Sequence, residues 1–359
     1  MLLSRASGAA MADAAPARIA VTRRTRELDG NIAAPDLATI IAEGVPAILK
    51  GAARSWPLVQ VGLGSPERAV DYLLRFHSGQ PVVGYTADPA TGGRFHYNDD
   101  ATAMNFRGER VAFDAFIARV FDHRGKPDAP AFYIGSTDLD TFFPGFRAEN
   151  ELTPAGDLFA KHPPLASIWL GNRTIAAAHY DMSNNAACCA VGHRRFTLFP
   201  PDQVANLYPG PLAPTPGGQV VTMVDFAAPD LDLYPDFPKA AAAGEIAELE
   251  PGDVLVYPAL WWHQVEALDD FNVLVNYWWN AAPDFLDTPM TTLLHAMLSL
   301  RDRPAHEKAA WRAMFDYYIF GPPERPAAHL PAPALGPLAP LDPMAARQLR
   351  ALIQRQLNR

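Results

Sequence analysis

The segment His179-Tyr180-Asp181 holds two potential metal ligands with one residue between them. The triplet closes the apolar segment IAAAHYD, which predicts a strand. On a strand, residues i and i+2 face the same side, so His179 and Asp181 can point together. Two histidines and one carboxylate form the ligand set of non-haem iron enzymes, since three protein ligands leave metal positions open for dioxygen and a cosubstrate. A His-x-Asp triplet alone often occurs by chance, so this interpretation needs a second histidine.

His263 is the histidine best placed to complete the set. It follows PGDVLVYPALWW, which predicts a strand and an aromatic turn, and it opens the predicted strand HQVEAL. Taken alone, His263 would be read as a hydrogen-bonded core histidine. Together with the His-x-Asp strand, it completes a predicted catalytic metal site. Other histidines fall in predicted helices, loops or the tail: His77, His96, His123, His162, His295, His306 and His329.

A dicarboxylate cosubstrate would also need a buried cation for the carboxylate that points away from the metal. Arg194 and Arg195 open the strand after Gly192-His193, and strand alternation does not decide which of them faces inward. Asn276 is a polar residue in the apolar segment FNVLVNYWW. Buried amides need partners, so Asn276 either faces a ligand or belongs to a structural network.

The elements that position these residues are short strands separated by tight turns, a pattern typical of a sandwich or barrel. Gly192-His193 predicts a two-residue hairpin turn. Upstream, a mixed region is predicted, with helices at YLLRFHSG and FDAFIARVFDH and a long loop over 138–164. The predicted core strands are SIWLGN, IAAAHYD, NAACCAV, RRFTLFPP, DVLVYP, HQVEAL and FNVLVNYWW.

Three regions are predicted along the chain. Residues 1–30 form a loose arm, residues 31–283 the catalytic domain, and residues 284–359 a helical region. In that last region apolar residues recur at helical spacing in two stripes, more than one helix needs to dock on its own core. Two such stripes leave apolar surface for a partner.

Composition limits the partners and the compartment. The net charge of −9 disfavours nucleic acid, and we interpret the local cluster Arg18, Arg23, Arg24 and Arg26 as solvated. Cys188 and Cys189 are adjacent, so their side chains point to opposite faces of a strand and predict neither a disulfide nor a zinc site. With no run apolar enough for a signal peptide or a membrane span, we expect a cytoplasmic protein.

The chain resembles the JumonjiC-related cupin-like oxygenases, which are asparaginyl-hydroxylase-like enzymes, in HYDMSNNAACCAVGHRRFTLFPPDQVANLYP and EPGDVLVYPALWWHQVEALDDFNVLVNYWW. GVPAILKGAARSWP resembles the family's N-terminal strand and turn, so the similarity runs from about residue 35 to 280. The resemblance implies a mainly β (α+β) fold, with a double-stranded β-helix (cupin or jelly-roll) core, an N-terminal mixed region and C-terminal helices. It also implies Fe(II) and 2-oxoglutarate as cofactors, and a homodimer that forms through these C-terminal helices.

Carried over by position, the resemblance implies that His179, Asp181 and His263 bind Fe(II). Arg194 stands where the family usually has a lysine that pairs with the distal carboxylate of 2-oxoglutarate. Ala176 replaces the usual threonine or serine, and Thr174 on the same face is a substitute donor. The remaining residues that match the 2-oxoglutarate pocket are Asn185, Asn276 and Tyr133.

The resemblance implies hydroxylation or demethylation of a protein side chain or a small molecule. Two alternatives stay open. One is a metal-dependent cupin enzyme that does not use 2-oxoglutarate, which the changes at Arg194 and Ala176 favour. The other is a non-catalytic binding module, which the intact ligand set disfavours. Trp169, Trp261, Trp262, Trp278 and Trp279 could line a substrate groove or belong to the core.

Overall fold

Two β-sheets form the centre of the first structural unit of this computed structural model, which describes residues 20–30 and 34–358. Their central strands follow the orders β8-β15-β10-β13 and β9-β14-β11-β12. These strands are β8 (Leu165–Gly171), β9 (Ile175–Tyr180), β10 (Asn184–Val191), β11 (Arg194–Phe199), β12 (Glu245–Leu249), β13 (Val254–Tyr257), β14 (Trp262–Ala267) and β15 (Asn272–Trp279).

Strands that follow one another in the sequence mostly lie in opposite sheets, as in a jelly roll. This arrangement confirms the predicted cupin-like fold class but makes the predicted hairpin at Gly192-His193 wrong. Gly192 has φ +71° and turns the chain from β10 in one sheet to β11 in the other. A Cβ at Gly192 would lie 2.5 Å from Asn272 Oδ1, so packing at this corner requires glycine.

Further strands widen both sheets. β1 (Arg23–Arg24) and β5 (Arg94–Phe95) extend one sheet to six strands. The other has nine, with β2 (Arg26–Asp29) and β3 (Ala47–Lys50) at one edge and β7 (Ala131–Asp138), β4 (Val82–Ala87) and β6 (Phe106–Val111) at the other.

Residues 23–29 therefore differ from the predicted loose arm. β1 pairs in parallel with β12 and β2 with β3, which ties this segment to both sheets. Arg23 and Arg24 are exposed and lie near Glu245 and Glu248. The rest of the predicted arm, residues 1–19, lies outside the described residues.

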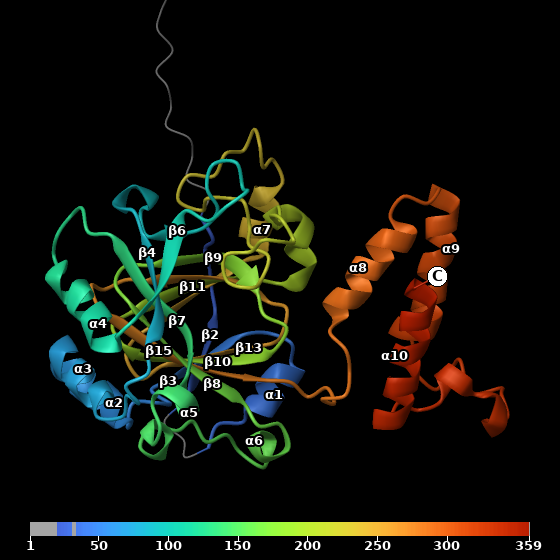
Figure 1. Cartoon of the computed structure of the whole chain (residues 1–359), viewed down its shortest axis with the longest axis horizontal. Helices are drawn as coiled ribbons and strands as arrows, with labels where there is room; N and C mark the ends of the chain where they lie inside the picture. Colours follow the sequence, from blue (N-terminus) through green and yellow to red (C-terminus); the bar gives the residue numbers. More distant parts are fainter. Residues whose placement is uncertain (1–19, 31–33, 359) are drawn as a thin grey trace, which may run out of the picture. The chain divides into compact units, whose positions relative to one another are not determined.

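Two apolar layers hold the sheets in place. One fills the space between them, and the other lies between the nine-stranded sheet and its covering helices. Cys188 belongs to the outer layer and Cys189 to the inner one; both are free thiols, as their adjacency predicts. Figure 1 shows the covering helices α1 (Leu37–Ala42), α2 (Pro57–Gly64), α3 (Pro66–Leu74) and α4 (Phe113–Asp122).

Capping residues define where several helices begin. Asp36 caps α1 by accepting from the Thr39 N–H, and Ser65 caps α3 by accepting from the Arg68 N–H. The predicted long loop over residues 138–164 contains two short helices. They are α5 (Leu139–Phe142) and α6 (Leu158–Lys161). A further helix, α7 (Phe237–Ala243), precedes β12.

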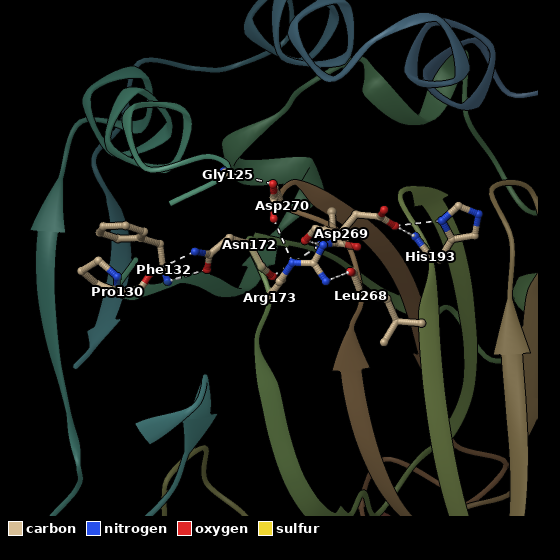
Figure 2. A network of polar contacts seen from close by, with 10 residues as sticks. Gly125, Pro130, Phe132, Asn172, Arg173, His193, Leu268, Asp269 and Asp270 are labelled. Atoms are coloured by element: carbon tan, nitrogen blue, oxygen red, sulfur yellow. Dashed lines mark hydrogen bonds and ion pairs between the residues drawn. The ribbon is translucent and has the colours of Figure 1, made fainter. Parts of the chain in front are cut away.

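A polar network joins the loops at one end of the barrel (Figure 2). The Asn172 side chain accepts from the Phe132 N–H at 2.8 Å and donates to the Pro130 carbonyl at 2.9 Å. Arg173 donates to Asp270 at 2.9 Å, and Asp270 also accepts from the Gly125 N–H. These bonds fix the connection between β8 and β9, the strand that leads to His179.

The second structural unit starts at Ala281, close to the predicted boundary at 283. Large apolar side chains are exposed in this unit, among them Leu298, and Ile319 and Phe320 in the π-helical segment Asp316–Phe320. Over the described residues, no helix is long and apolar enough to cross a membrane. The α-helices of the second structural unit are α8 (Pro289–Leu300), α9 (Ala305–Phe315) and α10 (Pro343–Leu357).

Candidate metal centre

Three side chains predicted to bind a metal come together at the end of β9. β9 and β14 pair antiparallel with His179 directly opposite His263, and the two imidazole centroids are 4.3 Å apart. Asp181 follows β9, and its Oδ2 lies 3.6 Å from His263 Nε2. One ligand atom from each of the three residues fits within 4.8 Å of the others. The spacing suits a single ion.

Both histidines are held in the tautomer that binds a metal through Nε2. His179 Nδ1 lies 2.8 Å from the Ala177 carbonyl oxygen, and His263 Nδ1 lies 2.9 Å from that of Trp261. A carbonyl oxygen only accepts, so each Nδ1 carries a proton, and a lone pair for a metal can lie only on Nε2. Burial, followed by His179, lowers the pKa of His263 to about 4, which keeps His263 neutral near pH 7.

The Asp181 carboxylate is oriented by two donors. Its Oδ2 accepts from Trp278 Nε1 at 3.1 Å and from Asn185 Nδ2 at 3.2 Å. The Asp181 backbone carbonyl accepts from the Leu260 N–H at 2.8 Å, which fixes the end of β9 to the turn before β14. Outer hydrogen bonds of this kind set the angle at which a carboxylate meets a metal.

The three ligands line a cavity of about 730 Å³. This volume lies within the roughly 300–1,000 Å³ that small-molecule sites occupy. Asp181 is part of the wall, and so are both histidines, so a bound ion would present its remaining positions to the cavity. The arrangement is an open metal site rather than a closed structural one.

Arg194, and not Arg195, faces inward. Arg194 is 2% exposed, and its Nε and Nη2 have no hydrogen-bond partner in the protein. Burial lowers its pKa, while the nearby Tyr133 raises it. Arg195 lies at the surface beside Glu248. An unpaired buried guanidinium fits an anionic ligand, which is the role that the resemblance implies for this position.

The other predicted cosubstrate residues take different places. Tyr133, Asn185 and Asn276 line the cavity, while Arg194 and Thr174 are not among its lining residues. Asn276 Oδ1 accepts from Trp169 Nε1 at 2.6 Å, and Asn185 Oδ1 is buried without a partner. Thr174 is buried just before β9, and its carbonyl accepts from the Ala267 N–H.

Several lining residues were not predicted or were left undecided. Among the five tryptophans left open, Trp169, Trp278 and Trp279 line the cavity, and Trp261 and Trp262 do not. The hydrogen bond from Trp278 to Asp181 was not predicted, although Trp278 and Asn276 alternate onto the same face of β15. The wall at Gly135-Ser136 is also new: it is an irregularity inside β7, where Ser136 has φ +43°. No sequence pattern in residues 131–136 indicates such a bulge.

Comparison with known proteins gives a match to the cupin-like domain over residues 34–285. HSPB1-associated protein 1 of Mus musculus is 31% identical over 148 residues, which cover 40% of this chain and 30% of that protein. tRNA wybutosine-synthesizing protein 5 of Danio rerio is 39% identical over 204 residues, which cover 51% of this chain and 57% of that protein. The same protein of Gallus gallus is 26% identical over 275 residues, which cover 71% of this chain and 77% of that protein.

The extent of these matches differs between relatives. The chain spans less than a third of the length of the mouse HSPB1-associated protein 1 and just over half of the zebrafish protein. The match to the domain includes all three candidate metal ligands, Arg194, and the cavity-lining residues Tyr133, Asn185 and Asn276. It ends close to the boundary between the two structural units.

Proposed function

Because this chain belongs to the cupin-like domain family and its relatives are JumonjiC-like cupin proteins, we propose that it is an Fe(II)- and 2-oxoglutarate-dependent oxygenase. Its reaction is the hydroxylation, or the demethylation, of a protein side chain or a small molecule. The observation that carries this proposal is the convergence of His179, Asp181 and His263 on the wall of one cavity.

The ligand chemistry supports iron over the ions of closed structural sites. Two neutral imidazoles and one carboxylate leave about three of six metal positions for a cosubstrate and dioxygen. A structural zinc site would use four protein ligands. Within the described part of the chain, no fourth histidine, cysteine or acidic side chain belongs to this cluster.

We assign the cosubstrate to the side chains around Arg194. The guanidinium Nε and Nη2 would bind the distal carboxylate of 2-oxoglutarate, since both lack partners in a buried position. Tyr133, Asn185 and Asn276 line the neighbouring cavity and would supply hydrogen bonds. Thr174 remains predicted from the resemblance alone.

Iron(II), when bound with 2-oxoglutarate, supplies the activation of dioxygen that oxidation of a C–H bond requires. The protein's part is to hold Nδ1 of His179 and His263 on backbone carbonyls, which leaves Nε2 of each to bind the metal, and to orient the Asp181 carboxylate through Trp278 and Asn185. The apolar cavity walls exclude water from the reacting atoms. Loss of a methyl group follows from the same hydroxylation when the carbon carries nitrogen.

Protein side chains and small molecules are preferred over nucleic acid as substrates because the chain carries a net charge of −9. One relative is named for tRNA wybutosine synthesis, and that chemistry is not part of this proposal. A cytoplasmic location belongs to the proposal, since both cysteines are free thiols, as a reducing compartment maintains them.

The decisive experiment is an anaerobic titration of the full chain with Fe(II) and 2-oxoglutarate, followed by visible absorption. We expect a metal-to-ligand charge-transfer band that needs both components. The band should disappear in His179→Ala and persist in His329→Ala, a matched control because His329 is exposed in the second structural unit.

Each other outcome points to a different function. Iron binding without a band on addition of 2-oxoglutarate would indicate a metal-dependent cupin enzyme that does not use this cosubstrate. Absence of iron binding to the wild-type chain would favour a non-catalytic binding module and contradict the proposal.

A further inference from the structure

The cavity beside the metal ligands is almost free of ionisable charge. Among the described residues that line it there is no lysine, arginine or glutamate, and Asp181 is the one carboxylate. Burial raises the pKa of Tyr133 to about 12, so this phenol stays neutral. Apart from the metal centre and Arg194, which interacts with Tyr133 and is assigned to the cosubstrate, a charged group entering this space would lose its hydration and find no counter-charge.

One wall of the cavity is a continuous row of aromatic rings. Ring centroids of successive members lie 5.1–5.8 Å apart, within the range of favourable aromatic pairs. The row ends at Trp278, whose Nε1 donates to the metal-ligand carboxylate of Asp181. In order, its members are Tyr85, Phe106, Phe95, Tyr133, Trp169 and Trp278.

Backbone irregularities keep this aromatic wall open. A Cβ at Gly135 would lie 3.1 Å from Trp169 Cζ3, so glycine lets the indole lie against β7. Ser136 adopts φ +43°, a strained value for serine, and also lines the cavity. Strain of this kind persists where the surrounding structure maintains it, and it is concentrated at functional sites. The polar side chains Ser136, Gln219 and Asn280 on the lining are all neutral.

We propose that this cavity selects a substrate whose reacting part is an uncharged aromatic or apolar group, packed along the aromatic wall and directed at the metal centre. This inference rests on the proposed function, because it assigns the substrate class of that oxygenase. Lysine and arginine side chains, carboxylates and phosphate-bearing groups are excluded as reacting parts. Neutral side chains of a peptide and neutral small molecules share the required chemistry.

The test measures binding to the full chain without iron or 2-oxoglutarate, so its result does not depend on oxygenase chemistry. Three probes carry the same ring: p-cresol is neutral, benzylammonium is cationic and p-toluenesulfonate is anionic. Calorimetric titration, with saturation-transfer NMR to detect weak ligands, gives each dissociation constant. We expect p-cresol to bind and each charged probe to bind about tenfold more weakly or not at all.

A variant in the wall locates the binding. Phe106→Ala should weaken p-cresol binding about three- to tenfold, because it removes one ring of the row. Phe106→Leu keeps the apolar volume and serves as the second variant if alanine disturbs the edge strand β6. Phe320→Ala, which removes a ring 76% exposed in the second structural unit, should leave p-cresol binding unchanged.

Two results would overturn the inference. One is a charged probe that binds as tightly as p-cresol and loses affinity in Phe106→Ala. The other is p-cresol binding that is absent or insensitive to both Phe106 variants. If p-cresol binds as expected while the iron titration fails, only the oxygenase proposal falls.

A neutral peptide distinguishes the two sources of substrate. Tighter binding of acetyl-Gly-Phe-Gly-amide than of p-cresol would assign the cavity to a peptide side chain. Tighter binding of p-cresol would assign it to a small molecule. Both results support an uncharged aromatic or apolar substrate.

Discussion

At the scale of single residues, Arg194 is a buried cation whose missing partners a ligand would supply. A buried charge without a partner destabilises the folded state, and replacing it by an apolar residue often stabilises a protein. Arg194 has two guanidinium nitrogens without partners, although other arginines such as Arg147 and Arg195 are paired with carboxylates. An anionic cosubstrate would supply the missing acceptors.

Arg194→Met should therefore separate stability from binding. We expect the metal-free protein to become more stable to urea, because an unpaired buried charge is removed. Binding of 2-oxoglutarate should weaken about 10- to 100-fold, measured by calorimetry in the presence of Mn(II) as a redox-inert substitute. Arg195→Met, one residue along and at the surface, is the control and should change neither quantity appreciably. Unchanged binding in Arg194→Met would remove this residue from the cosubstrate site.

Trp278 offers a second test at this scale. Trp278→Phe keeps an aromatic ring but removes the N–H that donates to Asp181. Since outer hydrogen bonds tune metal affinity, we expect Fe(II) to bind about 10- to 100-fold more weakly in an anaerobic titration. Trp279→Phe changes the neighbouring ring, which has no hydrogen bond to Asp181, and should keep wild-type affinity within about twofold. Equal affinities in the two variants would show that the indole only packs.

At the scale of elements, the Asn172 side chain connects the end of β8 to the start of β7. Its amide satisfies the Phe132 N–H and the Pro130 carbonyl, and the residue is 8% exposed. Its neighbour Arg173 reaches Asp270 at the surface (Figure 2). A buried amide that serves two backbone groups stabilises more than an exposed ion pair.

Asn172→Ala should accordingly destabilise the first structural unit by about 1–3 kcal/mol, because the buried Phe132 N–H and the part-buried Pro130 carbonyl lose their partner. Arg173→Ala should cost about 1 kcal/mol or less. Urea unfolding followed by tryptophan fluorescence reports mainly on this unit, since only Trp311 among the seven tryptophans lies beyond Asn280. Equal losses in the two variants would contradict the argument.

The features that could be predicted from the sequence are those that local residue patterns determine, and the features that were missed depend on residues far apart in the chain. His179 and Asp181 were recognisable because strand alternation is a local pattern, and His263 because a strand and a turn lead into it. Strand β1 could not be predicted, because Arg23 pairs in register with Glu245, which is more than 200 positions away. The Gly192 corner has the residues of a hairpin, and only the sheet order shows that its two strands separate.

At the scale of the whole molecule, the second structural unit exposes more apolar surface than a solvated helical unit needs. Leu298 is 80% exposed, Phe320 76% and Ile319 64%. Large apolar side chains exposed in this number are a feature of interaction sites. The proposal that these helices form a homodimer gives that surface a function.

Light scattering on the purified full chain should give the mass of a dimer at micromolar concentration. Leu298→Glu should shift it to a monomer, because a charge would be buried in the interface. Leu63→Glu changes a leucine that is 60% exposed in the first structural unit and should remain dimeric. A wild-type chain that is monomeric at this concentration would remove the dimer proposal.

The pairing of His179 with His263 also has a kinetic consequence. The two residues are 84 positions apart, and β10, β11, β12 and β13 are formed by the chain between them. Contacts across so long a segment form late in folding, because the entropy of closing the loop must be offset first. An ion held by both strands would therefore bind after the barrel has closed. It would lengthen the lifetime of the folded chain without speeding its formation.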